Sequence, residues 1–324
     1  QGLIWGIMAI GVFITYKILD FADLTVDGTL GLGGVVAVVL ISNGVPVPVA
    51  MLIAFLAGCA AGLCTALLNT MLGIPGILAG ILTQLALYSV YLDINGKANA
   101  PVSVDKFPLV ISSRYVTAGN EVVDIIRTVG TALLFVVLII AALYWFFGTE
   151  YGMAIRATGC NSAMSKAEGI NPKRTTIIAL VLAAMLYKPL KKYIQGFADV
   201  NMGRGAIVIG LAAVIIGMVL GEVILRKHFN FIGKLAFTAL GAIIYFIVLR
   251  IVLLLGLSTD NTKMFSALIV AIFLAVPYLQ KTSKTSFRRA AKRSAGAAAS
   301  AAAAESEHFG QVMQNSVTGK KEDK

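Results

Sequence analysis

The sequence predicts an all-α membrane protein with about nine (8–10) transmembrane helices and an inverted internal repeat. Three observations support this class. The chain of 324 residues is 58% hydrophobic and only 13% charged, whereas soluble domains carry about 25% charged residues. Long uncharged runs follow one another along most of the chain, without the short alternating segments of a β-barrel. Finally, one Gly-rich acidic phrase occurs twice.

Nine runs are apolar enough to be interpreted as membrane-spanning helices. They cover approximately residues 1–19, 28–42, 46–70, 75–92, 122–147, 174–195, 203–222, 232–256 and 263–280. The second run is short for a hydrocarbon core of about 30 Å and is expected to be a half-helix or a tilted piece. In the sixth, the apolar part ends near Leu186 and is followed by "YKPLKKY".

Charge predicts the orientation of these spans. The net charge is +11, and Lys and Arg concentrate in the loop 148–174, the segment 223–231 and the tail 281–324. Cytoplasmic loops of membrane proteins carry such an excess, so these segments and the C-terminus are expected in the cytoplasm. No folded basic module is present to bind nucleic acid, so that function is excluded.

The repeated phrase is "FADLTVDGTLGLGGVVAVV" from Phe21 and "FADVNMGRGAIVIGLAAVI" from Phe197. The two copies align without a gap, placing Gly34 opposite Gly210. Five predicted spans lie between them, and an odd number of crossings inverts the second copy relative to the first. Inverted repeats with short Gly-interrupted segments are typical of transporters, whose pathway lies where the repeats meet.

Enzymatic motifs are missing from the sequence. The two histidines, His228 and His308, lie in a loop and in the tail, and no phosphate-binding Gly-rich motif with its Lys occurs. We therefore expect no catalysis, no cofactor and no metal in this chain. If transport is driven by ATP, the ATPase is a different chain.

Few polar residues lie within or at the edges of the predicted spans. Carboxylates there suggest either helix caps or the lining of a pathway, and both interpretations remain open. Asn69 and Gln84 are expected to make hydrogen bonds between helices. The candidates for a pathway or a helix cap are Asp23, Asp27, Asn69, Gln84, Asp199 and Asn201.

The basic loop after the fifth span reads "EYGMAIRATGCNSAMSKAEGINPKRTTIIAL". Its middle is expected to form a short helix over residues 160–168 along the cytoplasmic membrane face. Gly159 and Gly169 would permit sharp turns at its ends. Met164 and Ala167, three residues apart, would form a small apolar knob.

This loop resembles the cytoplasmic coupling segment of permease subunits in the branched-chain amino acid and ribose class of bacterial ABC importers. "LDFADLTVDGTLGLGG", "QGFADVNMGRGAIVIGLAAVIIG" and "MFSALIVAIFLAVP" look like the same family. The similarity covers about residues 1–280 and is greatest to the subgroup linked to aromatic amino acid uptake. The resemblance implies an ATPase-coupling loop whose residues include Arg156, Ala157, Gly159, Asn161, Met164, Ala167, Gly169 and Ile170.

The resemblance also implies partners and a location. A second permease copy, two cytoplasmic ATPases holding ATP and Mg²⁺, and an extracytoplasmic solute-binding lipoprotein would assemble around this chain in the bacterial cytoplasmic membrane. The expected activity is import of a small solute, and an amino acid is the expected class. The alternative is a self-contained secondary transporter or channel, which would need an ion-coupling site in its own spans.

The expected organisation has two parts. A transmembrane permease domain covers 1–280, with repeat halves at about 1–147 and 174–280 and the coupling loop 148–173 between them. A basic, low-complexity cytoplasmic tail follows over 281–324.

Overall fold

The structure is a computed structural model. It divides the chain into two units, Gln1–Phe273 and Leu274–Lys324. The residues it describes are 2–95, 99–101, 121–186, 197–199, 203, 205–225 and 230–254, together with 264, 267, 268, 270, 271 and 275. Nearly all described residues belong to the first unit, so the fold below is that of this unit.

Among the described residues of the first unit, the regular structure is helical apart from two three-residue strands. The first helix continues directly into a π-helix, and two short helices precede α8. The elements in chain order are α1 (Gly2–Phe13), η1 (Ile14–Ile18), α2 (Thr25–Ser42), α3 (Val47–Thr70), α4 (Gly76–Asn95), β1 (Asn99–Pro101), α5 (Glu121–Phe147), α6 (Glu150–Cys160), α7 (Ser162–Ala167), α8 (Pro172–Leu186), β2 (Phe197–Asp199), α10 (Ala206–Leu225) and α11 (Phe231–Leu254).

The predicted class, a multispanning helical membrane protein, is confirmed. Within the described residues, six helices are long and apolar enough to cross a membrane, namely α2, α3, α4, α5, α10 and α11. Gly2–Ile18 is a shorter apolar helix. The second predicted span is longer than expected, because α2 begins at Thr25. Most of the ninth predicted span lies outside the described residues, so the count of nine remains a prediction.

Local sequence signals set several helix boundaries. Thr149 has an extended backbone and its side chain accepts a hydrogen bond from Gly152 N, so it caps α6. The first turn of α3 contains a proline, where a missing N–H costs nothing. Gly44 and Gly73 have φ values of 83° and 69° in the turns that follow α2 and α3, a conformation that glycine adopts at no steric cost.

Helix α1 forms the core of the unit. It packs against α11, α10, α8 and α5, and every residue from Gly6 to Thr15 is buried. A helix that is apolar on all sides must be covered by protein or by lipid, and protein covers this part of α1. In contrast, one side of α5 exposes Leu134, Val137 and Leu138, each more than half accessible, as expected for a lipid-facing surface.

Glycines allow the helices to approach closely, as is common between membrane helices. A Cβ built on Gly62 of α3 would lie 2.9 Å from the carbonyl oxygen of Leu180 in α8. One on Gly217 of α10 would lie 2.8 Å from Thr238 Cα in α11. The backbones therefore touch at these points, and any side chain would force the helix pair apart.

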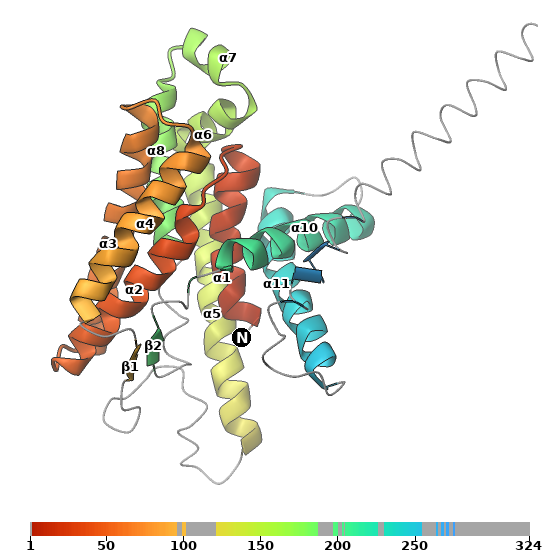
Figure 1. Cartoon of the computed structure of the whole chain (residues 1–324). Helices are drawn as coiled ribbons and strands as arrows, with labels where there is room; N and C mark the ends of the chain where they lie inside the picture. The colour runs from red at the N-terminus through yellow and green to blue at the C-terminus, as the bar shows by residue number, and fades with distance from the viewer. Residues whose placement is uncertain are drawn as a thin grey trace, which may run out of the picture. The chain divides into compact units, whose positions relative to one another are not determined.

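The strands β1 and β2 form an antiparallel pair in which Asn99 lies opposite Asp199. Figure 1 shows this ribbon towards the lower end of the bundle and the short helices α6 and α7 at the upper end. The interpretation of Asp199 as a cap of the following helix is therefore wrong, since Asp199 lies in β2 and α10 begins only at Ala206. Backbone pairing with β1 holds this second "FAD" in an extended conformation.

Candidate functional site

The segment between α5 and α8 folds as two short helices rather than the single one expected. Helix α6 extends to Cys160, and α7 follows over Ser162–Ala167. They are separated by Asn161, whose backbone is extended with φ −159° and ψ 102°. Its side-chain oxygen accepts hydrogen bonds from Ala163 N and Met164 N, both at 3.1 Å. Asn161 therefore ends α6 and caps α7.

Gly169 ends α7 with a positive φ of 85°. The Ile170 N–H donates to the Ser165 carbonyl at 2.9 Å, and the Gly169 N–H donates to the Lys166 carbonyl at 3.2 Å. This is the pattern by which a left-handed glycine satisfies the last free carbonyls of a helix. Both ends of α7 are thus fixed by hydrogen bonds, and the turn predicted at Gly169 is present.

The turn expected at Gly159 is absent, because this residue lies inside α6. A Cβ on Gly159 would lie 2.9 Å from Leu19 Cα and would overlap the carbonyl group of Ile18. The glycine therefore serves close packing of α6 on the end of η1, not chain reversal. A glycine needed for a turn and one needed for contact look the same in a sequence.

The side chains of α7 divide by exposure. Met164 is 60% exposed, and Ala167, Lys166 and Glu168 are also exposed. Ser165 is only 2% exposed and donates to the Asn161 carbonyl at 3.0 Å. The short helix therefore turns one residue towards the protein and presents an apolar methionine and an alanine to its surroundings.

Helix α6 is joined to its neighbours by two side-chain contacts. The hydroxyl oxygens of Thr158 and Thr175 lie 2.9 Å apart in a buried hydrogen bond between α6 and α8. The Arg156 guanidinium carbon lies 5.3 Å from the centre of the Phe231 ring at the start of α11, a distance typical of a cation–π interaction. Ala157 and Ile170 are half-buried beside these contacts.

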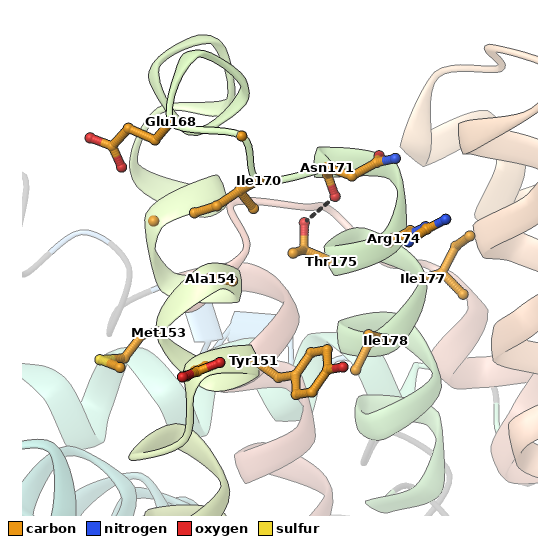
Figure 2. A pocket seen from close by; sticks show the side chains of 13 residues that line it. Tyr151, Met153, Ala154, Glu168, Ile170, Asn171, Arg174, Thr175, Ile177 and Ile178 are labelled. Carbon is orange, nitrogen blue, oxygen red and sulfur yellow. Dashed lines mark hydrogen bonds between the residues drawn. The ribbon is translucent and has the colours of Figure 1, made fainter.

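A groove of about 900 Å³ lies between α6 and α8. Its wall combines apolar and charged groups, and it includes Glu168 and Gly169 at the end of α7. Figure 2 shows Tyr151 directed from α6 towards Ile178 of α8, with Arg174 and Asn171 higher on the α8 side. The groove and the exposed side of α7 therefore form a continuous surface at this end of the protein.

A buried chain of polar groups joins α2, α3 and α4. The Asp23 carboxylate accepts hydrogen bonds from the backbone N–H of Thr25, at 2.9 Å, and from its hydroxyl. The Thr65 hydroxyl lies 3.3 Å from that of Thr25 and 3.0 Å from that of Thr83. All four residues are at most 4% exposed. Sequence inspection missed the threonines, because single threonines in apolar runs resemble ordinary helix positions.

Asp27 connects the two copies of the repeated phrase. Its carboxylate oxygens accept hydrogen bonds from Gly205 N and Ile207 N, both at 2.9 Å. These amides lie at the first turn of α10, so Asp27 of α2 caps a helix from the other repeat. Capping was one of the two interpretations considered for this residue, although the capped helix is not its own.

The contact between the repeats is reciprocal. In the gapless alignment Asp27 corresponds to Gly203 and Gly31 to Ile207. Asp27 bonds to Ile207 N, and a Cβ on Gly203 would lie 3.4 Å from Gly31 N. When residue i of one repeat contacts residue j of the other, a two-fold axis requires that the residues equivalent to i and j also contact each other. This supports the inverted repeat, although α10 starts five residues later than α2 in the alignment.

The remaining candidates lie apart from this contact. The hydrogen bond expected from Asn69 to another helix is not the one found: its side chain donates to the Ile74 carbonyl at 2.8 Å and so stabilises the turn between α3 and α4. Gln84 is half-buried on α4, where its Cα would be 2.9 Å from a Cβ on Gly28. Asp199 lies in β2. Asn201 lies outside the described residues.

Membrane-spanning helices and a contact between two copies of a repeated segment are typical of membrane transport proteins. The family model described as "Branched-chain amino acid transport system / permease component" matches residues 1–277. The chain belongs to this family.

Curated relatives extend over most of the chain. A tyrosine transport system permease protein of Clostridioides difficile (strain R20291) is 36% identical over 287 residues, covering 88% of this chain and 91% of the relative. An uncharacterised protein of Rickettsia prowazekii (strain Madrid E) is 31% identical over 280 residues, covering 85% and 94%. The fructose import permease protein FruF of Bifidobacterium longum (strain NCC 2705) is 25% identical over 284 residues, covering 84% and 74%. No solved structure gives a significant match.

These relatives and the family define the activity at the level of class. The chain is a multi-pass membrane protein, the permease subunit of an ATP-binding-cassette importer for a small solute. It is a transport component, and the family is not one of enzymes.

Proposed function

We propose that this permease imports an amino acid, with an aromatic side chain as the first candidate. The support is the family description and the tyrosine permease relative. The solute would be delivered by an extracytoplasmic binding lipoprotein and would cross the bacterial cytoplasmic membrane through a pathway between the repeats. A second copy of this permease would complete the membrane part, and the C-terminus would lie in the cytoplasm.

ATP hydrolysis would occur on a separate ATPase chain that holds ATP and Mg²⁺. The observation that carries this proposal is α7, a short exposed helix fixed at both ends by Asn161 and Gly169. A segment that receives force must be rigid, and hydrogen bonds at both ends make it so. The groove shared with Glu168 and Gly169 extends the same surface.

Met164 and Ala167 are the apolar groups of α7 that would be buried against the ATPase. Met164→Asp would bury a charge in that interface without touching the bundle, since the side chain is 60% exposed in the isolated permease. We expect loss of the ATPase stimulation caused by solute-loaded binding protein in proteoliposomes. Lys166→Gln is the matched control, because it lowers the charge of α7 by the same single unit at an exposed position.

Full stimulation and uptake in Met164→Asp would show that α7 does not contact the ATPase. Uptake by the permease alone, with no ATPase chain in the liposomes, would instead support a secondary transporter or a channel. Competition between solutes for the binding lipoprotein, measured by calorimetry, would test the proposed amino acid.

A further inference from the structure

The segment joining α1 to α2 departs from regular helix. The end of α1 widens into η1, so that Leu19 N donates to the Ile14 carbonyl at 3.0 Å and Phe21 N to the Thr15 carbonyl at 2.9 Å. Asp20 then adopts a positive φ of 55°. Single-turn π-helices and left-handed non-glycine residues both concentrate at functional positions. We call residues 14–24 the α1–α2 junction.

Two helices press their backbones against this junction. Gly159 of α6 lies against Ile18 and Leu19, as described above. On α4, a Cβ on Gly76 would lie 2.7 Å from Phe21 Cζ, and one on Gly80 would lie 2.9 Å from Leu24 N. Gly76 meets the side-chain ring of Phe21, whereas Gly159 and Gly80 meet backbone atoms. Contacts between backbones contain no flexible side chain that could absorb a displacement, and closely packed protein is hardly compressible.

The junction leads directly to the contact between the repeats. It ends at Asp23 and Leu24, next to the buried hydroxyls of α3 and α4. One helical turn further, Asp27 holds the first turn of α10. A movement of Ile18 therefore reaches the second repeat through a short stretch of covalent backbone and two hydrogen bonds.

We infer that the contact of Gly159 with the α1–α2 junction passes motion of the coupling segment into the bundle, and that Gly159 is a positioning residue for transport. The inference rests on the proposed role of α6 and α7 as the ATPase-driven segment. Helix α6 and the start of α8 would move as one body, since the Thr158–Thr175 hydrogen bond joins them. That body presses on η1 at Gly159 and displaces the junction.

Arg156 offers a competing route, because it reaches α11 through the ring of Phe231. Its side chain is exposed and flexible, whereas the Gly159 contact is between backbones. Arg156→Gln removes the cation–π contact and leaves Gly159 in place. Comparing Arg156→Gln with a substitution of Gly159 therefore shows which of the two contacts transmits the motion.

The test is Gly159→Ala in the complete transporter, with wild-type ATPase and binding protein in proteoliposomes. The methyl group pushes α6 away from η1 but leaves α7 unchanged. We expect stimulated ATP hydrolysis to persist while the solute transported per ATP falls at least about fivefold, the lower end of typical coupling between sites. Gly130→Ala is the control, because a Cβ there meets nothing within 4 Å.

Three outcomes would overturn the inference. A wild-type transport ratio in Gly159→Ala, or an equal loss in Gly130→Ala, removes the role of this contact. A loss confined to Arg156→Gln assigns the coupling to α11 instead. By contrast, failure of the proposed coupling role itself appears in Met164→Asp, which would then keep full ATPase stimulation.

A second measurement does not depend on how Gly159→Ala folds. Lys17 of η1 and Cys160 of α6 are both exposed, so spin labels can be placed on Lys17→Cys and on the native Cys160, with Cys59 and Cys64 replaced by Ala. If the contact transmits motion as a unit, the distance between the labels stays constant between nucleotide-free and ATP-bound transporter. A distance that changes with nucleotide shows that α6 slides past η1, and it overturns the inference.

Discussion

Removal of the Asp27 carboxylate should loosen α10 from α2. The side chain accepts two backbone hydrogen bonds of 2.9 Å, from Gly205 N and Ile207 N. Gly205 is exposed, so water can replace the carboxylate there at little net cost, whereas Ile207 is half-buried. A lost helix cap costs about 0.5–2 kcal/mol, and a hydrogen bond to a charged group contributes about 1.5–3 kcal/mol.

Asp27→Ala should therefore reduce the free energy of unfolding by about 2 kcal/mol, and Asp27→Asn by about half as much because one oxygen remains. The measurement is equilibrium unfolding of the purified permease in mixed detergent micelles. Asp93→Ala is the control, since Asp93 is an exposed carboxylate at the end of α4. It should unfold like the wild type.

Unchanged stability of Asp27→Ala would refute capping as the role of this residue. If uptake is lost at the same time, the pathway interpretation is favoured, because a group lining a pathway acts on the solute rather than on the fold. If stability and uptake fall in proportion, capping alone explains the role of Asp27.

Two further perturbations test the packing of the bundle. Thr65→Val removes the hydroxyl that lies between Thr25 and Thr83. The free energy of unfolding should fall by about 0.6 kcal/mol, the average for hydrogen bonds between membrane helices. An unchanged free energy of unfolding would show that the buried chain of hydroxyls does not contribute to stability. Gly217→Ala should separate α10 from α11 and lower the free energy of unfolding, measured in the same micelles, by about 1–3 kcal/mol. Gly130→Ala is the control and should leave stability unchanged, because a Cβ there meets nothing within 4 Å. Equal stability of both variants would contradict the close approach at Gly217.

The class and most helix positions could be predicted because they depend on composition and run length. Hydrocarbon admits only backbone that is satisfied internally, so each long apolar run is a helix whatever its neighbours. The end of α7 was predictable for a similar reason, since Gly169 adopts a conformation that other residues avoid.

Contacts between distant segments could not be predicted. A turn was expected at both Gly159 and Gly169, and only the fold shows that Gly159 instead packs on the backbone of η1. Likewise, Asp27 looks like a first-turn residue of its own helix, and only the fold brings the amides of α10 to it. The second "FAD" is extended because β1 pairs with it, and the β1 residues Asn99, Ala100 and Pro101 are of types that are depleted in strands.

Asp27 lies against Gly203, the residue that corresponds to it in the other copy of the repeated phrase. Two different residues can lie at this position because both halves belong to one polypeptide. Two identical half-length chains would have to place the same residue on both sides of the axis. Paired aspartates there would repel each other, while paired glycines would leave the amides of α10 without an acceptor. In the fused chain, one copy supplies the negative charge and the other supplies the empty space next to the Asp27 carbonyl. The presence of two different residues at the axis thus depends on the covalent link between the halves.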